Sequence, residues 1–149
     1  MNLGLLGAGI VMGLSAVGSA IGIAIAGQGV IGAWKKCYAA NKPAPMTLLA
    51  FAGAPLTQTF YGFILGFVFM MGPALENGFI ESGKEMLYLG IGIASGLAIC
   101  FSAIAQGMAG AAGADATGET GKGFVNYMMV VGICETVAIF AMVLSMINL

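Results

Sequence analysis

Residues 3–33 read LGLLGAGIVMGLSAVGSAIGIAIAGQGVIGA, an apolar stretch without a charged side chain. About 20 apolar residues suffice for a helix to cross the hydrocarbon core of a bilayer. An isolated strand cannot cross, because its unpaired backbone groups are too costly in hydrocarbon. No basic segment precedes the stretch, and it continues past the length of a signal peptide. It therefore predicts a membrane-spanning helix.

Three further apolar stretches follow, at about residues 46–71, 86–112 and 124–149. The chain is 60% hydrophobic and 7% charged, with a mean hydropathy of +1.01, so it has too little charge to cover a water-soluble domain. The short connections require neighbouring helices to be antiparallel. We predict an all-α membrane protein of two helical hairpins, residues 1–72 and 86–149, joined by a loop at residues 73–85.

The lysines predict the orientation of the chain in the membrane. Three lie in the first predicted connection (residues 34–45) and one in the third (residues 113–123), whereas the middle connection holds only Lys84. Positive charge stays on the cytoplasmic side. We therefore expect residues 34–45 and 113–123 to be cytoplasmic and both termini to lie outside. The absence of an evident targeting extension favours a cell membrane.

Composition excludes several classes of function. A net charge of −1 provides no basic field that could bind nucleic acid. Histidine is absent, so the chain lacks the usual proton shuttle near neutral pH and the commonest transition-metal ligand. The three cysteines, Cys37, Cys100 and Cys134, lack metal-ligand spacing and are expected to be small apolar fillers.

The two halves of the chain resemble each other. Aligning Gln28-Gly29 with Gln106-Gly107 also places Gly18 on Gly96. With one further residue of offset, Leu56-Thr57 falls on Glu135-Thr136. The pattern indicates a duplicated hairpin, a recurrent way of building transporters.

Small residues recur around the first and third spans. The pairs with four-residue spacing, which lets helix backbones approach closely, are Gly9/Gly13, Gly18/Gly22 and Gly92/Gly96. Packing within a monomer accounts for one such stripe. Because the glycines of the first span face several directions, we expect copies of the chain to pack side by side in a homo-oligomeric ring surrounded by lipid.

A single carboxylate lies deep inside a span. Glu135 is flanked by apolar residues in VVGICETVA (residues 130–138). A charge at that depth costs about 2.5–3.5 kcal/mol on insertion scales. It must be neutralised by a proton or paired with a cation, so we interpret Glu135 as an ion-carrying residue rather than as packing.

The second and third spans carry polar groups at a similar depth. Ala54, Thr57, Gln58 and Tyr61 share one helix face, and Gln106 adds a side-chain amide. Pro55 lacks an amide hydrogen, which frees a carbonyl one turn earlier. Hydroxyl, amide and carboxylate oxygens are the ligands that a hard cation prefers, and their number favours Na⁺ over a proton. Gln28 has no such companions and is expected to be a packing residue.

These features together resemble the c or K proteolipid of rotary V-type and A-type ATPases. The residues that carry the resemblance are Pro55-x-Thr57-Gln58-x-x-Tyr61, Ala105-Gln106-Gly107 and Glu135-Thr136. The resemblance implies a Na⁺ site formed by Thr57, Gln58, Gln106, Glu135 and the carbonyl of Ala54, with Tyr61 hydrogen-bonded to the glutamate. The proline itself most directly frees the carbonyl of Phe51, so the role of Ala54 comes from the resemblance alone.

The resemblance also implies partners. A stator membrane subunit would supply an arginine opposite Glu135, and central-stalk subunits would connect the ring to ATP hydrolysis. This chain has no phosphate-binding loop with Lys-Ser/Thr and is not expected to be an enzyme by itself. No cofactor is expected, only the transported cation.

Three alternatives stay open. The same ring could carry H⁺, with Thr57, Gln58 and Gln106 acting as hydrogen-bond bridges between helices. A small secondary transporter fits the duplication but not the parallel repeats or the glycines on many faces. A purely structural ring or pore would make Glu135 dispensable.

Overall fold

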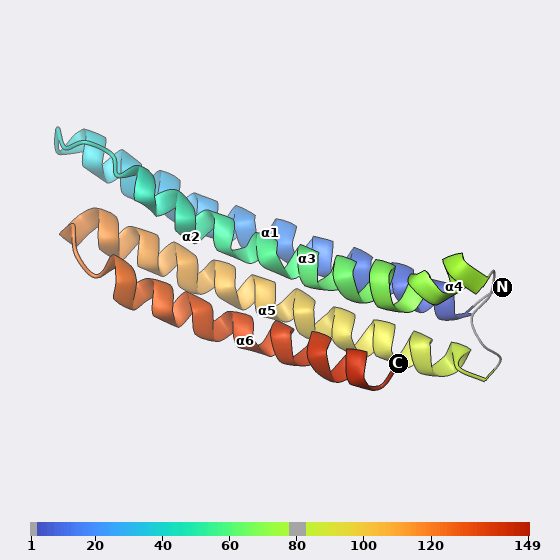
Figure 1. Cartoon of the computed structure of the whole chain (residues 1–149). Helices are drawn as coiled ribbons and strands as arrows, with labels where there is room; N and C mark the ends of the chain where they lie inside the picture. Colours follow the sequence, from blue (N-terminus) through green and yellow to red (C-terminus); the bar gives the residue numbers. More distant parts are fainter. Residues whose placement is uncertain (1–2, 78–82) are drawn as a thin grey trace.

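The computed structural model describes residues 3–77 and 83–149, and no strand occurs among them. Four helical segments are long and apolar enough to cross a membrane: Leu3–Ala39, Met46–Glu76, Glu85–Thr120 and Phe124–Ile147. They lie side by side in one elongated bundle (Figure 1). The predicted all-α fold with four candidate spans is confirmed.

Helices α1 (Leu3–Ala39) and α5 (Glu85–Thr120) form the most extensive contact in the bundle. They run parallel, because Gly7 lies against Tyr88 and Gly22 lies against Ala103. A Cβ atom at either glycine would overlap the backbone of α5. Small residues therefore bring the two backbones together. These are the two helices that the sequence alignment makes equivalent, so the repeat is also visible in space.

The second span is one continuous helical segment that changes between 3-10, α and π geometry. Its parts are a 3-10 turn at Met46–Leu48, α2 (Leu49–Gly53), a 3-10 turn at Ala54–Leu56, α3 (Thr57–Phe63), a π-helical stretch at Ile64–Met71 and α4 (Gly72–Asn77). The missing amide hydrogen of Pro55 explains the tightened turn in which it lies. The carbonyl oxygen of Phe51 lies against α5, 2.9 Å from where a Cβ at Gly110 would stand.

Two helices are longer than the sequence predicts. Helix α1 continues to Ala39 instead of ending near residue 33, and α5 continues to Thr120 instead of residue 112. The connections shrink to residues 40–45 and 121–123. At 1.5 Å per residue, the 37-residue α1 is about 55 Å long, well beyond a hydrocarbon core of about 30 Å. The first charged residues thus mark the expected edge of the hydrocarbon, not the end of the helix.

Two glycines with a left-handed backbone conformation lie between α5 and the last helix, α6 (Phe124–Ile147). Gly121 has a φ of 67° and its amide donates to the carbonyl of Thr117 at 2.8 Å, which closes α5 with a left-handed residue. Gly123, with a φ of 81°, precedes α6. Glycine is the residue that adopts these angles without steric cost, so a very tight hairpin is possible here.

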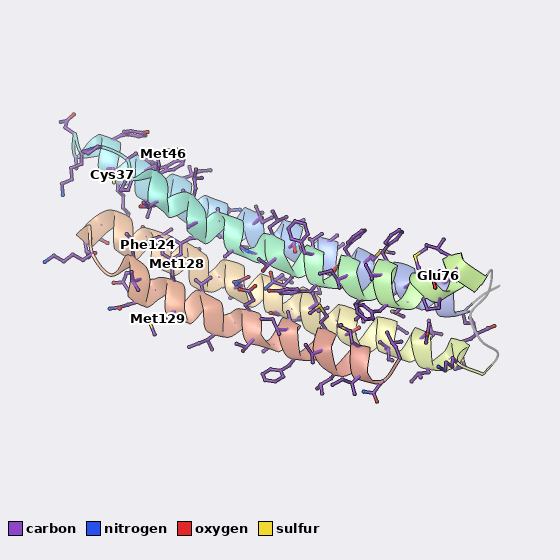
Figure 2. The ribbon with its side chains drawn as sticks, in the orientation of Figure 1. Cys37, Met46, Glu76, Phe124, Met128 and Met129 are labelled. Carbon is purple, nitrogen blue, oxygen red and sulfur yellow. The ribbon has the colours of Figure 1, made fainter. Side chains whose placement is uncertain are left out.

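The predicted middle connection, residues 73–85, is partly helical. Helix α4 continues through Glu76, which lies at the end of the bundle opposite Cys37 and Met46 (Figure 2). Residues 78–82, including Glu81, lie outside the described part of the chain, as do Met1 and Asn2.

The glycine contact between α1 and α5 yields a stability prediction. Replacing Gly107 by Ala should lower the unfolding temperature in detergent by several degrees, because its Cβ would overlap Gly22. Such overpacking costs about 1–3 kcal/mol. The matched control is Gly132→Ala in α6, which meets nothing within 4 Å and should gain up to about 1 kcal/mol of helix propensity. Equal shifts for the two variants would contradict a packing role for Gly107.

Candidate functional site

Glu135 projects from the middle of α6 and is contacted by both hairpins. The hydroxyl of Tyr61, on α3, donates to Glu135 Oε1 at 2.5 Å. The side-chain amide of Gln106, on α5, lies 3.4 Å from Glu135 Oε2. The two carboxylate oxygens are therefore approached by neutral donors from two different helices. Glu135 itself is partly exposed in the single chain.

A second layer of polar groups continues from Gln106 into α3. Gln58 Nε2 donates to Gln106 Oε1 at 2.8 Å, and both glutamines are fully buried. Thr57 Oγ1 lies 3.2 Å from Gln58 Oε1 and 3.0 Å from the carbonyl oxygen of Ala54, to which it donates. The five side chains and one carbonyl singled out by sequence thus form one continuous cluster. The structure places them together.

The 3-10 turn at Ala54–Leu56 leads directly into the part of α3 that belongs to this cluster. Ala54 belongs to the tightened turn that contains Pro55, and Thr57 begins α3 directly after it. The carbonyl of Phe51 instead lies against Gly110 of α5. Ala54, rather than Phe51, is therefore the backbone oxygen joined to the cluster, through the hydroxyl of Thr57.

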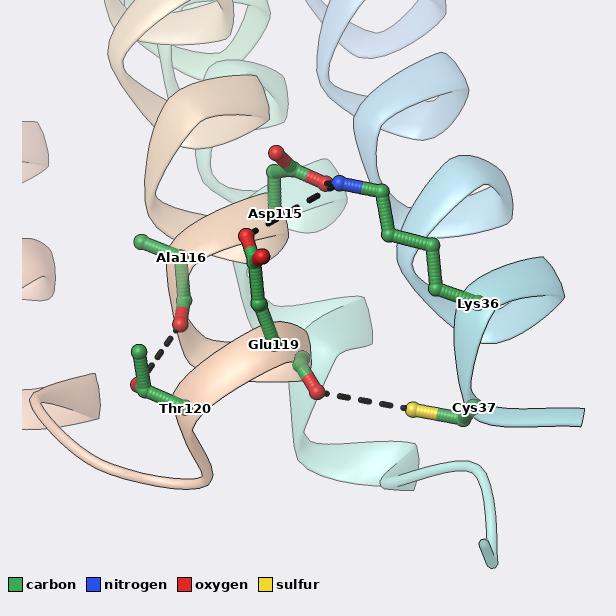
Figure 3. A network of polar contacts seen from close by, with 7 residues as sticks. Lys36, Cys37, Asp115, Ala116, Glu119 and Thr120 are labelled. Carbon is green, nitrogen blue, oxygen red and sulfur yellow. Dashed lines mark hydrogen bonds and ion pairs between the residues drawn. The ribbon is translucent and has the colours of Figure 1, made fainter. Parts of the chain in front are cut away.

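Charge is concentrated far from this cluster. At the end of the bundle that carries both short connections, Lys36 pairs with Asp115 at 2.8 Å and lies 3.9 Å from Glu119 (Figure 3). Cys37, next to it, donates to the carbonyl of Gly118. Neither of these ion pairs reaches Glu135, whose described partners are a phenol and an amide. No positive side chain among these contacts compensates the carboxylate.

The cluster contains oxygen groups of the kind that hard cations prefer as ligands in proteins. It contains one carboxylate, one threonine hydroxyl, two amide oxygens and one backbone carbonyl. Among residues 3–77 and 83–149, no group of three or more His, Cys, Asp or Glu side chains gathers to hold a metal ion, and the three cysteines are free thiols. Oxygen ligands of this kind suit an alkali cation better than a transition metal.

Sequence reasoning missed one residue beside the cluster. Ser102 lies one helical turn before Gln106 on α5, and its hydroxyl donates to the carbonyl oxygen of Cys134 at 2.7 Å. The i, i+4 spacing from Gln106 was the available signal. Gln28, the repeat counterpart of Gln106, is exposed on α1 and takes no place in the cluster.

Comparison with known proteins adds two findings. Residues 89–148, which cover most of the second hairpin, match the family model for the C subunit of ATP synthase. The chain is also 30% identical over 148 residues to the K subunit of the A-type ATP synthase of Methanocaldococcus jannaschii, a match that covers 99% of the chain. The chain spans 61% of the length of that relative.

The bond between Tyr61 and Glu135 can be tested by chemical labelling. Replacing Tyr61 by Phe removes the donor to Glu135 Oε1, so the carboxyl should react about tenfold faster with a hydrophobic carbodiimide, as expected for losing a hydrogen bond to a charged group. Mass spectrometry of the labelled chain measures the rate. Tyr127→Phe, also on a span but outside the cluster, is the control and should leave the rate unchanged. Unchanged labelling of the Tyr61 variant would show that the phenol does not hold the carboxyl.

Proposed function

We propose that the chain is a c/K-type proteolipid of a rotary ATPase, a rotor-ring subunit that carries Na⁺ across the membrane on Glu135. Its similarity to the C subunit of ATP synthase and to the A-type K subunit supports this proposal. The observation that supports this most directly is the polar cluster that links one membrane-depth carboxylate to Tyr61, Gln106 and, behind them, Gln58, with no positive side chain among the described partners of the carboxylate. A cation bound there would neutralise the glutamate and let it face lipid during rotation.

Sodium is favoured over a proton by the number of oxygens. A proton needs only the carboxyl group and one hydrogen-bond partner, for which Tyr61 would be sufficient. Thr57, Gln58 and the carbonyl of Ala54 extend the cluster well past that requirement. Na⁺ needs several such oxygens to replace its hydration shell.

The site draws on both hairpins but contains one carboxylate. Leu56, which aligns with Glu135 in the repeat, is apolar and 46% exposed. The first hairpin therefore contributes Thr57, Gln58 and Tyr61 to a site whose charge comes from the second. One ion per four helices would give a low ratio of ions to ATP, which suits pumping against a steep gradient. Each elementary charge that crosses 100 mV requires about 2.3 kcal/mol.

The remaining parts of the machine are proposed from the resemblance. Helices α1 and α5 would line the inside of the ring, and the second span and α6 the outside. Gly9 and Gly13 of α1, whose Cβ positions are open within one chain, would leave room for a neighbouring copy. A stator arginine would hold Glu135 when it is empty, and stalk and catalytic subunits would supply ATP hydrolysis. As the lysines predict, we propose that residues 34–45 and 113–123 face the cytoplasm and that both termini face outside.

Replacing Glu135 by Gln should abolish ion-coupled turnover, because the variant cannot bind a cation by charge. Ring assembly should persist, since the amide keeps the shape of the side chain. Ion uptake into vesicles that hold the assembled complex measures transport, and the mass of the detergent-extracted ring measures assembly. Glu85→Gln, at the start of α5 and outside the cluster, is the control and should transport normally. Normal transport by the Glu135 variant would remove the central assignment.

Competition between Na⁺ and carbodiimide distinguishes the two cations. At mildly acidic pH, Na⁺ should protect Glu135 from labelling in proportion to its occupancy, whereas choline at equal ionic strength should not. The labelled fraction is measured as a function of Na⁺ concentration, and the curve gives the Na⁺ concentration at which labelling is half-protected. Labelling that is indifferent to Na⁺ but falls as the pH rises would replace the sodium ring by a proton ring and leave the rotor assignment in place.

A further inference from the structure

The last helix packs on the bundle along one face, and few of its side chains are fully buried. Only Val131 and Ala138 of α6 are buried, and they lie one turn before and one turn after Glu135. Large apolar residues on either side of them are exposed, such as Ile133 at 67% and Val137 at 54%. Partly buried side chains such as Phe124, Tyr127 and Met142 extend the contact along one face of α6, so packing sets which face meets the bundle. Directed bonds to its backbone add a geometric constraint at the turn that carries Glu135.

Two side chains of α5 supply such bonds. Ser102 Oγ donates to the carbonyl oxygen of Cys134 at 2.7 Å, and Gln106 Nε2 donates to that of Val131 at 3.1 Å. The donors are spaced i, i+4 and the acceptors i, i+3, so each pair lies on one helix face. The two bonds join facing surfaces of α5 and α6 at the turn that carries Glu135.

The bond of Ser102 is unusual for a serine inside a helix. A helical serine commonly donates to the carbonyl four residues earlier in its own helix. Ser95, also buried on α5, does so, because its hydroxyl donates to Ile91. Ser102, which is 4% exposed, instead bonds across to α6. Its acceptor is the carbonyl of the peptide that leads directly into Glu135.

We propose that Ser102 is a positioning residue for Glu135, which fixes the peptide before the glutamate and so aims its carboxylate at Tyr61 and Gln106. This inference rests on the proposed function, since it assigns Ser102 to the same ion site. Gln106 combines a bond to α6 with contacts to Glu135 and Gln58. The hydroxyl of Ser102 donates to the backbone of α6 and is not among the proposed ligands, so its effect on the ion would be indirect.

The test uses the assembled ring of the full-length chain with carbodiimide labelling of Glu135. Ser102→Ala should raise the Na⁺ concentration for half-protection about fivefold, as expected for losing one net hydrogen bond. Ser102→Thr, which keeps the hydroxyl, should restore it to within about twofold. Ser95→Ala removes an equally buried hydroxyl that bonds its own helix, and half-protection should stay unchanged. The unfolding temperature of each ring is recorded in parallel.

Several results would overturn the proposal. Unchanged half-protection in Ser102→Ala, an equal shift in Ser95→Ala, or a shift that Thr does not restore would each do so. Loss of the assembled ring in Ser102→Ala would assign the bond a purely structural role. If Na⁺ fails to protect even the unaltered ring, the sodium assignment fails by itself. The pH profile of labelling, compared between the unaltered ring and Ser102→Ala, then still decides the role of Ser102.

Discussion

A carboxylate at membrane depth has to be satisfied by groups that the protein itself supplies, because hydrocarbon offers none. Around Glu135 these groups are neutral: the phenol of Tyr61, the amide of Gln106 and, behind them, Gln58 and Thr57. Neutral donors stabilise a negative charge without cancelling it. In the proposed role the ionised carboxylate therefore still requires one positive charge, and the rest of the bundle holds these donors in place.

Glycines on α1 and α5 provide the close helix contact on which the position of these donors depends. The close approach of α1 and α5, made possible where Gly22 meets Gly107, joins the two hairpins along their whole length. Only when the hairpins are joined can α3 of the first and α6 of the second present their side chains to one another. The tightened turn at Pro55 and the π-helical stretch after Phe63 bracket the segment that carries Thr57, Gln58 and Tyr61. Backbone irregularity and side-chain chemistry thus coincide in the second span.

Much of this was predictable from residue patterns. Uncharged runs such as residues 3–33 identify the spans, and the shared face of Thr57, Gln58 and Tyr61 indicates that they meet one partner. Helix ends were not predictable in the same way. Helices α1 and α5 both continue past the expected edge of the hydrocarbon, where Lys36 of α1 pairs with Asp115 of α5. The bond from Ser102 to Cys134 was also hidden, since a serine hydroxyl in a helix has an equally good acceptor in its own backbone.

The shared construction of the site has a consequence for how the two copies of the hairpin can change. In the proposed role, the acidic copy determines how many charges one chain can carry, and the copy with Leu56 determines part of the environment that the ion meets. Substitutions in the copy with Leu56 can then change which ion is preferred, while the number of ions carried per chain stays constant. In that role neither copy forms the ion site alone, because the carboxylate comes from one copy and Thr57, Gln58 and Tyr61 come from the other, so the function depends on both copies remaining in one chain.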